Sequence, residues 1–388
     1  MRLSSSAAVS PEAAKGASAA AGAQVALVLW SGRLGGGETF TTELAGALRR
    51  RDVDARIVFV GTSERLAGRL LELGVPSASL GLARGRRVIA HPRSLARLVS
   101  EAGADCAILP SPGYLAASLR AGGYRRPIAA IEHGGLLQIK GLRLGRRVLR
   151  RIDRASGIWT CDVEVAVSQY VLEELRRHRH ARGLVWIPNG IDLARFSPPD
   201  TQAPEGHPFT IGYAGRLIAS KGVSDVIRAF EWLGRSEDCR LLIAGDGPER
   251  HTLEGLAKAL GVQDKIRFLG LVGDMPSFWR TCDIAVVPSA GWIESFCLAA
   301  VEAMACARPV VAVRAGALAE TIDENVTGVL VGQGDIAGLG RALKRYADDT
   351  RLRRQHGASA RRLCEERYDL AGSADRYAEL IASLSRER

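Results

Sequence analysis

The stretch FTIGYAGRLIASKG, residues 209–222, decides the fold. Phe209–Ala214 is an apolar run of the length of a buried strand, and Gly215-Arg216 follows it as a turn. Lys221-Gly222 then opens a helix. A glycine turn with two cations suits a diphosphate, because ligands of open parallel sheets bind at the carboxyl ends of the strands. The alternative is that both cations are ordinary surface charges.

The alternation of apolar runs and helical stretches continues on both sides of this stretch. Continuous apolar strands separated by helices predict parallel sheets that are covered on both faces. We expect strands at Gln24–Trp30, Ala55–Val60, Asp105–Leu109, Pro127–Ile131, Val163–Val167 and Leu184–Ile187, and then at Phe209–Ala214, Arg240–Ala244, Lys265–Leu269, Asp283–Val287 and Pro309–Val313. The first helix is expected at Glu38–Arg51.

A linker divides the alternation into two halves. Asp192–Pro208 holds four prolines and shows no periodicity. We therefore predict a leader at 1–22, a first α/β domain at 23–195 and a second at 196–369. The leader is rich in Ala and Ser and lacks the apolar core of a secretory signal, so we expect a cytoplasmic protein.

Composition excludes several classes of protein. Seven cysteines, an odd number without a C-x-x-C pair, argue against a disulfide framework and a structural zinc site, and no metal ligand set is apparent. No run approaches the roughly 18 apolar residues of a membrane-spanning helix. The net charge of +11 can attract anionic substrates, membranes or nucleic acid. Because no nucleic-acid-binding motif accompanies the charge, we expect no nucleic-acid partner.

The most basic segment is 140–154, which has seven basic residues and one acidic residue, Asp153. Leu144, Val148 and Ile152 recur at intervals of four, as on an amphipathic helix. The segment is either a solvated helix that packs on the sheet or a surface that meets anionic lipid. The second reading places the protein peripherally at the inner face of a membrane.

A glycine loop follows the first strand. Gly35, Gly36 and Gly37 let the backbone approach an anion, and the helix that begins there offers free N–H groups. The loop does not match the dinucleotide-binding G-x-G-x-x-G pattern. A tight turn without a ligand explains it as well.

Two carboxylates stand eight residues apart. If a helix begins near Phe296, Glu294 precedes it and Glu302 lies about two turns inside. Glu302 has apolar neighbours, and a buried carboxylate needs a partner. Hydroxyls of a sugar or ribose are one candidate; an ion pair with Arg308 is the other.

His133 directly follows a predicted strand and precedes two glycines. It therefore belongs at the carboxyl edge of the first sheet, where ligands bind. A lone histidine at such a place serves either structure or catalysis.

Taken together, the motifs resemble those of retaining glycosyltransferases of the GT-B fold, family four (glycosyl transferases group 1). In the second half they are Gly212-Tyr-Ala-Gly-Arg216, Lys221-Gly222, Leu242-Ile-Ala-Gly-Asp-Gly-Pro248, Ile266-Arg-Phe-Leu-Gly270, Val287-Pro-Ser289, Glu294 with Glu302-Ala-Met-Ala, Pro309-Val-Val311 and Thr327-Gly328. In the first half they are Gly35-Gly36-Gly37-Glu38, His133, Val167-Ser168 and Ile187-Pro-Asn-Gly-Ile-Asp192. They extend over nearly the whole chain from Gln24 onward.

The resemblance implies two Rossmann-like α/β domains that face each other across a cleft, with a C-terminal helix at 370–388 that completes the first domain. It implies that Arg216 and Lys221 hold the diphosphate of a nucleotide-sugar donor. Glu294 would contact sugar hydroxyls and Glu302 the ribose. The backbone around Phe296, Cys297 and Leu298 would face the donor, as would that of Gly35 and Gly36, and His133 would lie near the reacting carbon. No metal or other cofactor is implied, and the donor base, uridine or guanosine, is left open.

Position 297 departs from the family pattern, which often has glycine there. A Cys side chain keeps the backbone N–H but narrows the space, which affects sugar selection. The acceptor is either a small molecule of the aminocyclitol or natural-product type, or a lipid-linked glycan. A nucleotide-sugar epimerase of the same fold and a non-catalytic nucleotide-sugar-binding protein are the alternative functions.

Overall fold

The computed structural model describes residues 20–30, 35–62, 65–82, 85–111, 113–134, 160–178, 183–200, 207–233, 239–289 and 294–386. These residues form two compact units. The first contains the described residues up to Val167, then Val171–Gly190 and those from Leu370 onward. The second contains Ser168–Tyr170 and Ile191–Asp369. The basic segment 140–154 lies outside the described residues.

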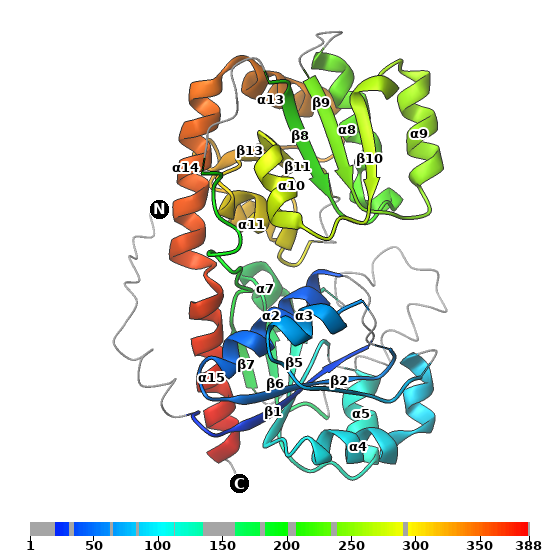
Figure 1. The fold of residues 1–388 in the computed structure, drawn as a ribbon, viewed down its shortest axis with the longest axis vertical. Coiled ribbons are helices and arrows are strands. Elements are labelled where there is room, and N and C mark those ends of the chain that lie inside the picture. Colours follow the sequence, from blue (N-terminus) through cyan, green and yellow to red (C-terminus); the bar gives the residue numbers. More distant parts are fainter. Residues whose placement is uncertain are drawn as a thin grey trace. The chain divides into compact units, whose positions relative to one another are not determined.

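The described strands of the first unit form a seven-stranded parallel sheet in the order β3-β2-β1-β4-β5-β6-β7 (Figure 1). Their bounds are β1 Gln24–Leu29, β2 Asp54–Phe59, β3 Ser77–Ser79, β4 Cys106–Leu109, β5 Ile128–Glu132, β6 Val163–Ala166 and β7 Gly183–Trp186. The order reverses beside β1, which is the topological switch point where open α/β sheets bind their ligands.

Helices cover both faces of this sheet. Successive strand residues point to opposite faces, so strands that are continuously apolar must be buried on both sides. They are α2 Gly36–Arg49, α3 Ala67–Glu72, α4 Pro92–Glu101, α5 Tyr114–Ala121, α7 Gln169–His178 and α15 Leu370–Arg386, with the 3₁₀ helix η1 at Gly85–Ala90. Ala26 and Val28 pack with Leu95 of α4 and Leu115 of α5 in one core. On α2, Phe40 contacts Tyr377 of α15, with ring centroids 6.1 Å apart.

The final helix belongs to the first unit although it comes last in the chain. Arg51, just beyond α2, forms a 2.5 Å ion pair with Asp375 of α15. At the start of α15, a side chain on Gly190 would lie 2.4 Å from the Cα of Leu370, so only glycine permits this approach. The chain from 370 onward thus packs on the first sheet's helix α2.

The described strands of the second unit form a six-stranded parallel sheet in the order β10-β9-β8-β11-β12-β13. Their bounds are β8 Phe209–Ala214, β9 Cys239–Ala244, β10 Ile266–Gly270, β11 Ile284–Val287, β12 Val310–Val313 and β13 Gly328–Val331. The helices are α8 Val223–Phe230, α9 Arg250–Ala259, α10 Met275–Thr281, α11 Leu298–Ala305, α12 Leu318–Thr321, α13 Ile336–Asp348 and α14 Thr350–Arg367, with 3₁₀ turns η3 Ala219–Lys221, η4 Glu231–Leu233 and η5 Gln263–Lys265. Figure 1 shows α8, α9 and α13 around β8, β9 and β10.

The expected strands are present within one or two residues, and two further strands occur. β3 has the sequence Ser-Ala-Ser and is exposed, so it lacks the apolar run that marks a buried strand. β13 follows Thr327 and pairs with β12. Within the described ranges, no helix is both long and apolar enough to span a lipid bilayer.

Candidate functional site

The central contact of the second unit joins a lysine and a glutamate at the carboxyl edge of its sheet. Lys221 ends the 3₁₀ turn η3 after β8, and Glu294 precedes α11. The Lys221 Nζ lies 2.5 Å from the Glu294 Oε1. Both side chains are largely buried, with 19% and 7% of their surfaces exposed. A charged, hydrogen-bonded pair of this kind is fixed in direction as well as in place.

The glycine after Lys221 makes this arrangement possible. Gly222 has a φ of 66°, in the left-handed region that favours glycine, and it caps the N-terminus of α8. A side chain there would lie 2.3 Å from the carbonyl oxygen of Pro288, which follows β11. The loops after β8 and β11 can therefore touch at backbone distance.

Arg216 occupies the same edge of the sheet but differs from Lys221 in its exposure. It follows Gly215 directly after β8, and its side chain is exposed. Its backbone carbonyl accepts a hydrogen bond of 3.1 Å from the hydroxyl of Tyr213. The structure thus brings Lys221 and Glu294 together, whereas Arg216 is an exposed residue directly after β8.

The helix that carries the second carboxylate begins two residues later than expected. α11 starts at Leu298, because Cys297 has a φ of 64° and a ψ of 74°, which no residue inside a helix adopts. Our expectation of a start near Phe296 was wrong, and Glu302 lies about one turn into the helix instead of two. A left-handed conformation is costly for a residue with a side chain, which gives position 297 a physical reason to prefer glycine.

The residues around this turn have different surroundings. Phe296 is buried, and its ring meets the ring of Tyr368 edge-on at 5.4 Å. Cys297 is half-buried, and burial together with the charge of Glu294 raises the pKa of its thiol. Leu298 is the first residue of α11. The thiol therefore stays protonated at neutral pH beside the Lys221–Glu294 pair.

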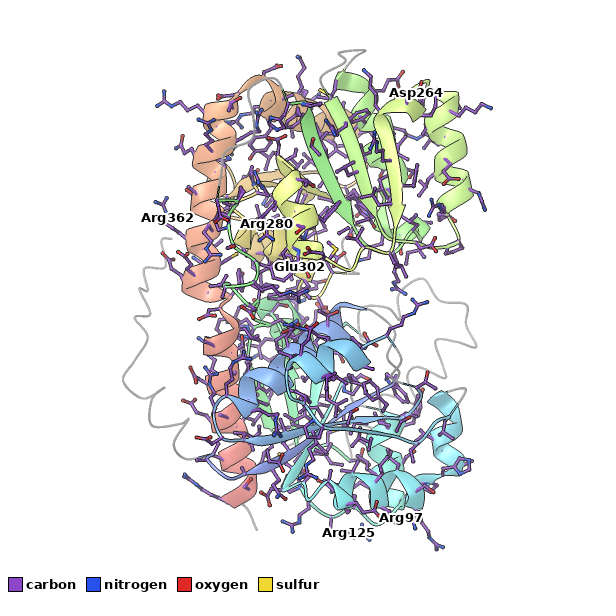
Figure 2. All side chains as sticks on the ribbon, viewed as in Figure 1. Arg97, Arg125, Asp264, Arg280, Glu302 and Arg362 are labelled. Carbon is purple, nitrogen blue, oxygen red and sulfur yellow. The ribbon has the colours of Figure 1, made fainter. Side chains whose placement is uncertain are left out.

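Glu302 accepts a hydrogen bond from a residue of a neighbouring helix. The indole Nε1 of Trp279 in α10 donates a hydrogen bond of 3.1 Å to the Glu302 Oε2. Glu302 is 8% exposed and Trp279 is fully buried. Arg308, the ion-pair partner that we considered, donates instead to the backbone carbonyl of Arg280 at 2.8 Å. Figure 2 shows Glu302 and Arg280 on these adjacent helices.

In the first unit, His133 packs against the start of α2. A side chain on Gly37 would lie 3.2 Å from the His133 Cδ2, so the imidazole rests on the backbone of that helical turn. The ring also meets Phe40 edge-on, with centroids 6.1 Å apart. Burial lowers the pKa of His133 to about 4. Its Nε2 is buried and has no hydrogen-bond partner among the described residues.

The glycine loop itself supplies the N-terminus of α2. Gly35 caps the helix with an extended backbone, and Gly36 is the first helical residue. The early N–H groups of a helix have no acceptors within it and attract anions. His133 lies beside this helix terminus, since it approaches the backbone of Gly37.

Three buried residues were not singled out from the sequence. Trp279 follows Phe278 in α10 and resembles an ordinary core residue, but its N–H donates to Glu302. Glu132, at the end of β5, accepts a hydrogen bond of 2.9 Å from the Gly134 N–H. Glu164 lies inside β6 and is fully buried. Both glutamates could have been found from the sequence, because each is a carboxylate within an otherwise apolar strand.

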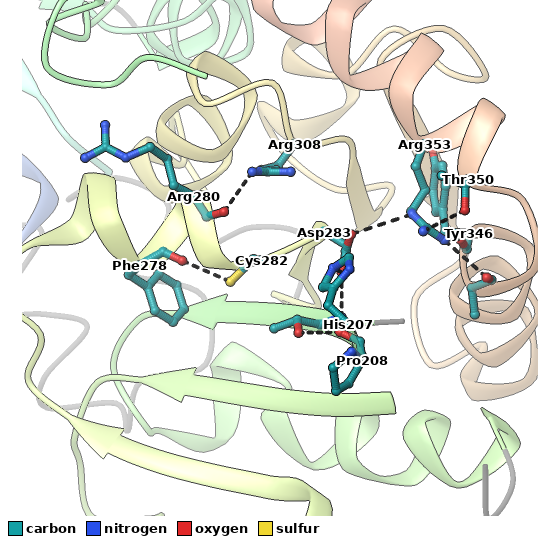
Figure 3. A network of polar contacts seen from close by, with 12 residues as sticks. His207, Pro208, Phe278, Arg280, Cys282, Asp283, Arg308, Tyr346, Thr350 and Arg353 are labelled. Atoms are coloured by element: carbon teal, nitrogen blue, oxygen red, sulfur yellow. Dashed lines mark hydrogen bonds and ion pairs between the residues drawn. The ribbon is translucent and has the colours of Figure 1, made fainter. Parts of the chain in front are cut away.

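A separate polar network lies at the opposite, amino-terminal edge of the second sheet (Figure 3). Asp283, just before β11, accepts hydrogen bonds from the backbone N–H of Thr210 at 2.8 Å and contacts His207 at 3.0 Å. Arg353 of α14 lies 3.8 Å from the same carboxylate. The network holds the starts of two neighbouring strands together.

Comparison with known proteins shows which family has this arrangement. Residues 34–195 match the family model of Glycosyltransferase Family 4, and residues 198–363 match Glycosyl transferases group 1. A GDP-mannose-dependent alpha-(1-6)-phosphatidylinositol monomannoside mannosyltransferase of Mycolicibacterium smegmatis is 30% identical over 334 residues, 77% of this chain and 84% of the relative. The chain is a family 4 glycosyltransferase.

Other similarities agree with this family. A D-inositol 3-phosphate glycosyltransferase of Salinispora arenicola is 35% identical over 221 residues, which is 50% of this chain and about half (49%) of that relative's length. The fold is that of GT-B glycosyltransferases. A sucrose-phosphate synthase from Thermosynechococcus elongatus superposes with a TM-score of 0.80 at 20% identity, over 94% of this chain and all of that one.

Proposed function

We propose that this glycosyltransferase moves a sugar from a nucleoside-diphosphate sugar to an acceptor hydroxyl with retention of the anomeric configuration. The observation that carries the proposal is the Lys221–Glu294 pair at the carboxyl edge of the second sheet. A fixed cation beside a fixed carboxylate matches a donor that carries a diphosphate next to sugar hydroxyls. The relative from Mycolicibacterium, which is named for its use of GDP-mannose, supports a donor of this class.

In this proposal, Lys221 and Arg216 neutralise the diphosphate. The exposed guanidinium of Arg216 can form two parallel hydrogen bonds to phosphate oxygens. Glu294 accepts hydrogen bonds from sugar hydroxyls while Lys221 holds its other side, and Glu302 accepts one from the ribose. Because two side-chain cations supply the charge, we propose that transfer needs no added metal ion.

For His133 we propose a hydrogen bond to a hydroxyl of the transferred sugar. With a pKa of about 4, the imidazole is neutral at physiological pH and can donate from one nitrogen. The partnerless Nε2 supports this role, because a buried polar atom without a partner is costly unless a ligand supplies one.

The proposed reaction is a front-face attack. The bond between the anomeric carbon and the diphosphate oxygen breaks, and the electron pair stays on the diphosphate. The acceptor oxygen forms the new bond on the same face, and its proton passes to the departing phosphate. Negative charge grows on the diphosphate as the bond breaks, so fixed cations stabilise the transition state more than the bound donor.

For the acceptor we propose either a small polyhydroxylated molecule or a lipid-linked one. The two relatives differ in this way, since one is named for D-inositol 3-phosphate and the other for a phosphatidylinositol mannoside. The segment 140–154, with its seven basic residues, supports peripheral contact with an anionic membrane in the lipid-linked case.

Mass spectrometry and NMR of the reaction products test the proposal. The full chain is incubated with UDP- and GDP-sugars, acceptors of both classes and EDTA. We expect a new glycoside whose anomeric configuration equals that of the donor. An isomerised donor would instead identify an epimerase, binding without turnover would identify a binding protein, and an inverted product would exclude the front-face scheme.

A further inference from the structure

The indole of Trp279 occupies a specific place between a strand and a helix. A side chain on Gly212 of β8 would lie 3.0 Å from the Trp279 Cζ3, so the indole rests on bare strand backbone. The helix that carries Trp279, α10, packs against α11, which carries Glu302. Trp279 is fully buried, and the centroid of its ring lies 4.8 Å from that of the Phe278 ring. An indole confined in this way has no freedom to turn its N–H elsewhere.

The indole N–H of Trp279 points at Glu302, the charged residue within α11. Its hydrogen bond to the Glu302 Oε2 is 3.1 Å long and buried. An indole N–H is a donor only and carries no charge. It therefore fixes the direction of the carboxylate without neutralising it, whereas an arginine at this place would form an ion pair that competes with a ligand hydroxyl.

We infer that Trp279 is a positioning residue for the donor nucleotide, because it holds Glu302 in the orientation that receives the ribose hydroxyls. This inference rests on the proposed function of the second unit as the donor-binding unit. Trp279 does not touch the donor in this account; it acts through Glu302. Preorganising an acceptor in a buried site increases the strength of the hydrogen bond that the ligand forms.

The test compares nucleotides that differ only in the ribose hydroxyls. Calorimetry gives the affinities of UDP and GDP and of their 2′,3′-dideoxy counterparts for wild type, Trp279→Phe and Glu302→Gln. We expect wild type to prefer one of the two ribonucleotides over its dideoxy form by about tenfold or more, as for hydrogen bonds to a charged group. Trp279→Phe should lose most of this preference and leave dideoxynucleotide affinity within about threefold, and Glu302→Gln should behave alike.

Two further variants separate orientation from packing. Trp279→Tyr restores a buried donor, and it should recover part of the preference. Phe278→Leu loosens the same helix but leaves the indole N–H intact, so it should keep the preference even if the protein unfolds more easily. Thermal unfolding shows that each variant is folded at the temperature of the measurement.

The outcomes distinguish this inference from the proposed function. If Trp279→Phe keeps the wild-type preference, or weakens both nucleotide forms equally, Trp279 only packs and the inference is wrong while the donor site stands. If wild type shows no preference for the ribose hydroxyls, Glu302 does not bind ribose, and both the inference and the proposed role of Glu302 are wrong. If Trp279→Phe does not fold, loss of the ribose preference in Phe278→Leu, which keeps the indole N–H, overturns the inference.

Discussion

The Nζ of Lys221 and the Oε1 of Glu294 lie 2.5 Å apart at the carboxyl edge of the second sheet, where a donor diphosphate is proposed to bind. The pair joins the turn after β8 to the segment before α11. Glu294 is the more deeply buried partner, so an unpaired charge there costs more than an unpaired charge on the lysine.

Removal of the lysine should destabilise the fold. Lys221→Met leaves the Glu294 carboxylate buried without its cation, and we expect the free energy of unfolding to fall by about 2–4 kcal/mol, less than for a fully buried pair. The double variant Lys221→Met with Glu294→Gln removes both charges and should recover most of this loss. Urea denaturation measures the free energy of unfolding of both variants. If the double variant is as unstable as the single one, Lys221 does not stabilise the fold by pairing with Glu294.

The pH dependence of stability should contain a contribution from His133. Its pKa is about 4 in the folded protein and near 6.5 when unfolded, so between these values the unfolded chain binds more protons. Stability is therefore complete above pH 6.5 and is lost as pH falls toward 4, by about 3 kcal/mol for this group.

Denaturation curves at a series of pH values test this contribution. His133→Gln should flatten the stability profile between pH 4 and 6.5. His251 provides the control, because its side chain is 96% exposed and its replacement by Gln should leave the profile unchanged. An unaltered slope in His133→Gln shows that the imidazole is not held neutral.

Gly37→Ala should impair activity more than stability. The added methyl would lie 3.2 Å from the His133 Cδ2, which pushes the ring by a few tenths of an ångström. Helix propensity offsets the strain, since Ala exceeds Gly by about 1 kcal/mol inside a helix. We expect turnover to fall about tenfold or more if His133 holds the transferred sugar as proposed, because small misplacements of a group that positions the substrate are costly.

Gly68→Ala is the matched control for this substitution. Gly68 also lies in a helix, α3, and a side chain there would meet nothing within 4 Å. Steady-state kinetics should show wild-type turnover for Gly68→Ala. Equal turnover in the two variants would show that the ring position does not matter for the reaction.

Cys297→Gly should stabilise the protein by about 0.5–1 kcal/mol. Relief of the left-handed conformation at φ 64° contributes about 1–2 kcal/mol, and the greater flexibility of unfolded glycine cancels part of it. Cys297→Ala removes the thiol but keeps the strain, so it should not be stabilised. Chemical denaturation measures the stabilities of the two variants. If the alanine variant is more stable than the glycine variant, the backbone at position 297 is not strained.

The sequence predicted the sheets because their central strands are long apolar runs. Ser77–Ser79 could not be predicted in this way, since an exposed edge strand buries nothing. The loop positions of Lys221 and His133 followed from strand ends, where parallel sheets bind ligands.

Side-chain partners were less accessible to sequence reasoning. The link from Trp279 to Glu302 joins residues 23 apart on two helices, and no local pattern encodes it. The late start of α11 depends on a single backbone conformation, that of Cys297, which is rare for a residue with a side chain. The contact of Gly37 with His133 required the packing of α2 against the end of β5.

The most direct test of the central claim is the single-turnover rate of Lys221→Ala and Arg216→Ala, measured with saturating donor and with donor affinity determined separately. Both cations are proposed to stabilise the departing diphosphate. Arg216→Lys serves as the comparison, because a point charge does not reproduce a planar two-pronged donor.

We predict that each alanine variant loses about a hundredfold to a thousandfold in rate while donor affinity falls much less, and that Arg216→Lys recovers little of the rate. A rate near that of wild type in either alanine variant would contradict the account, because the diphosphate would then be held elsewhere.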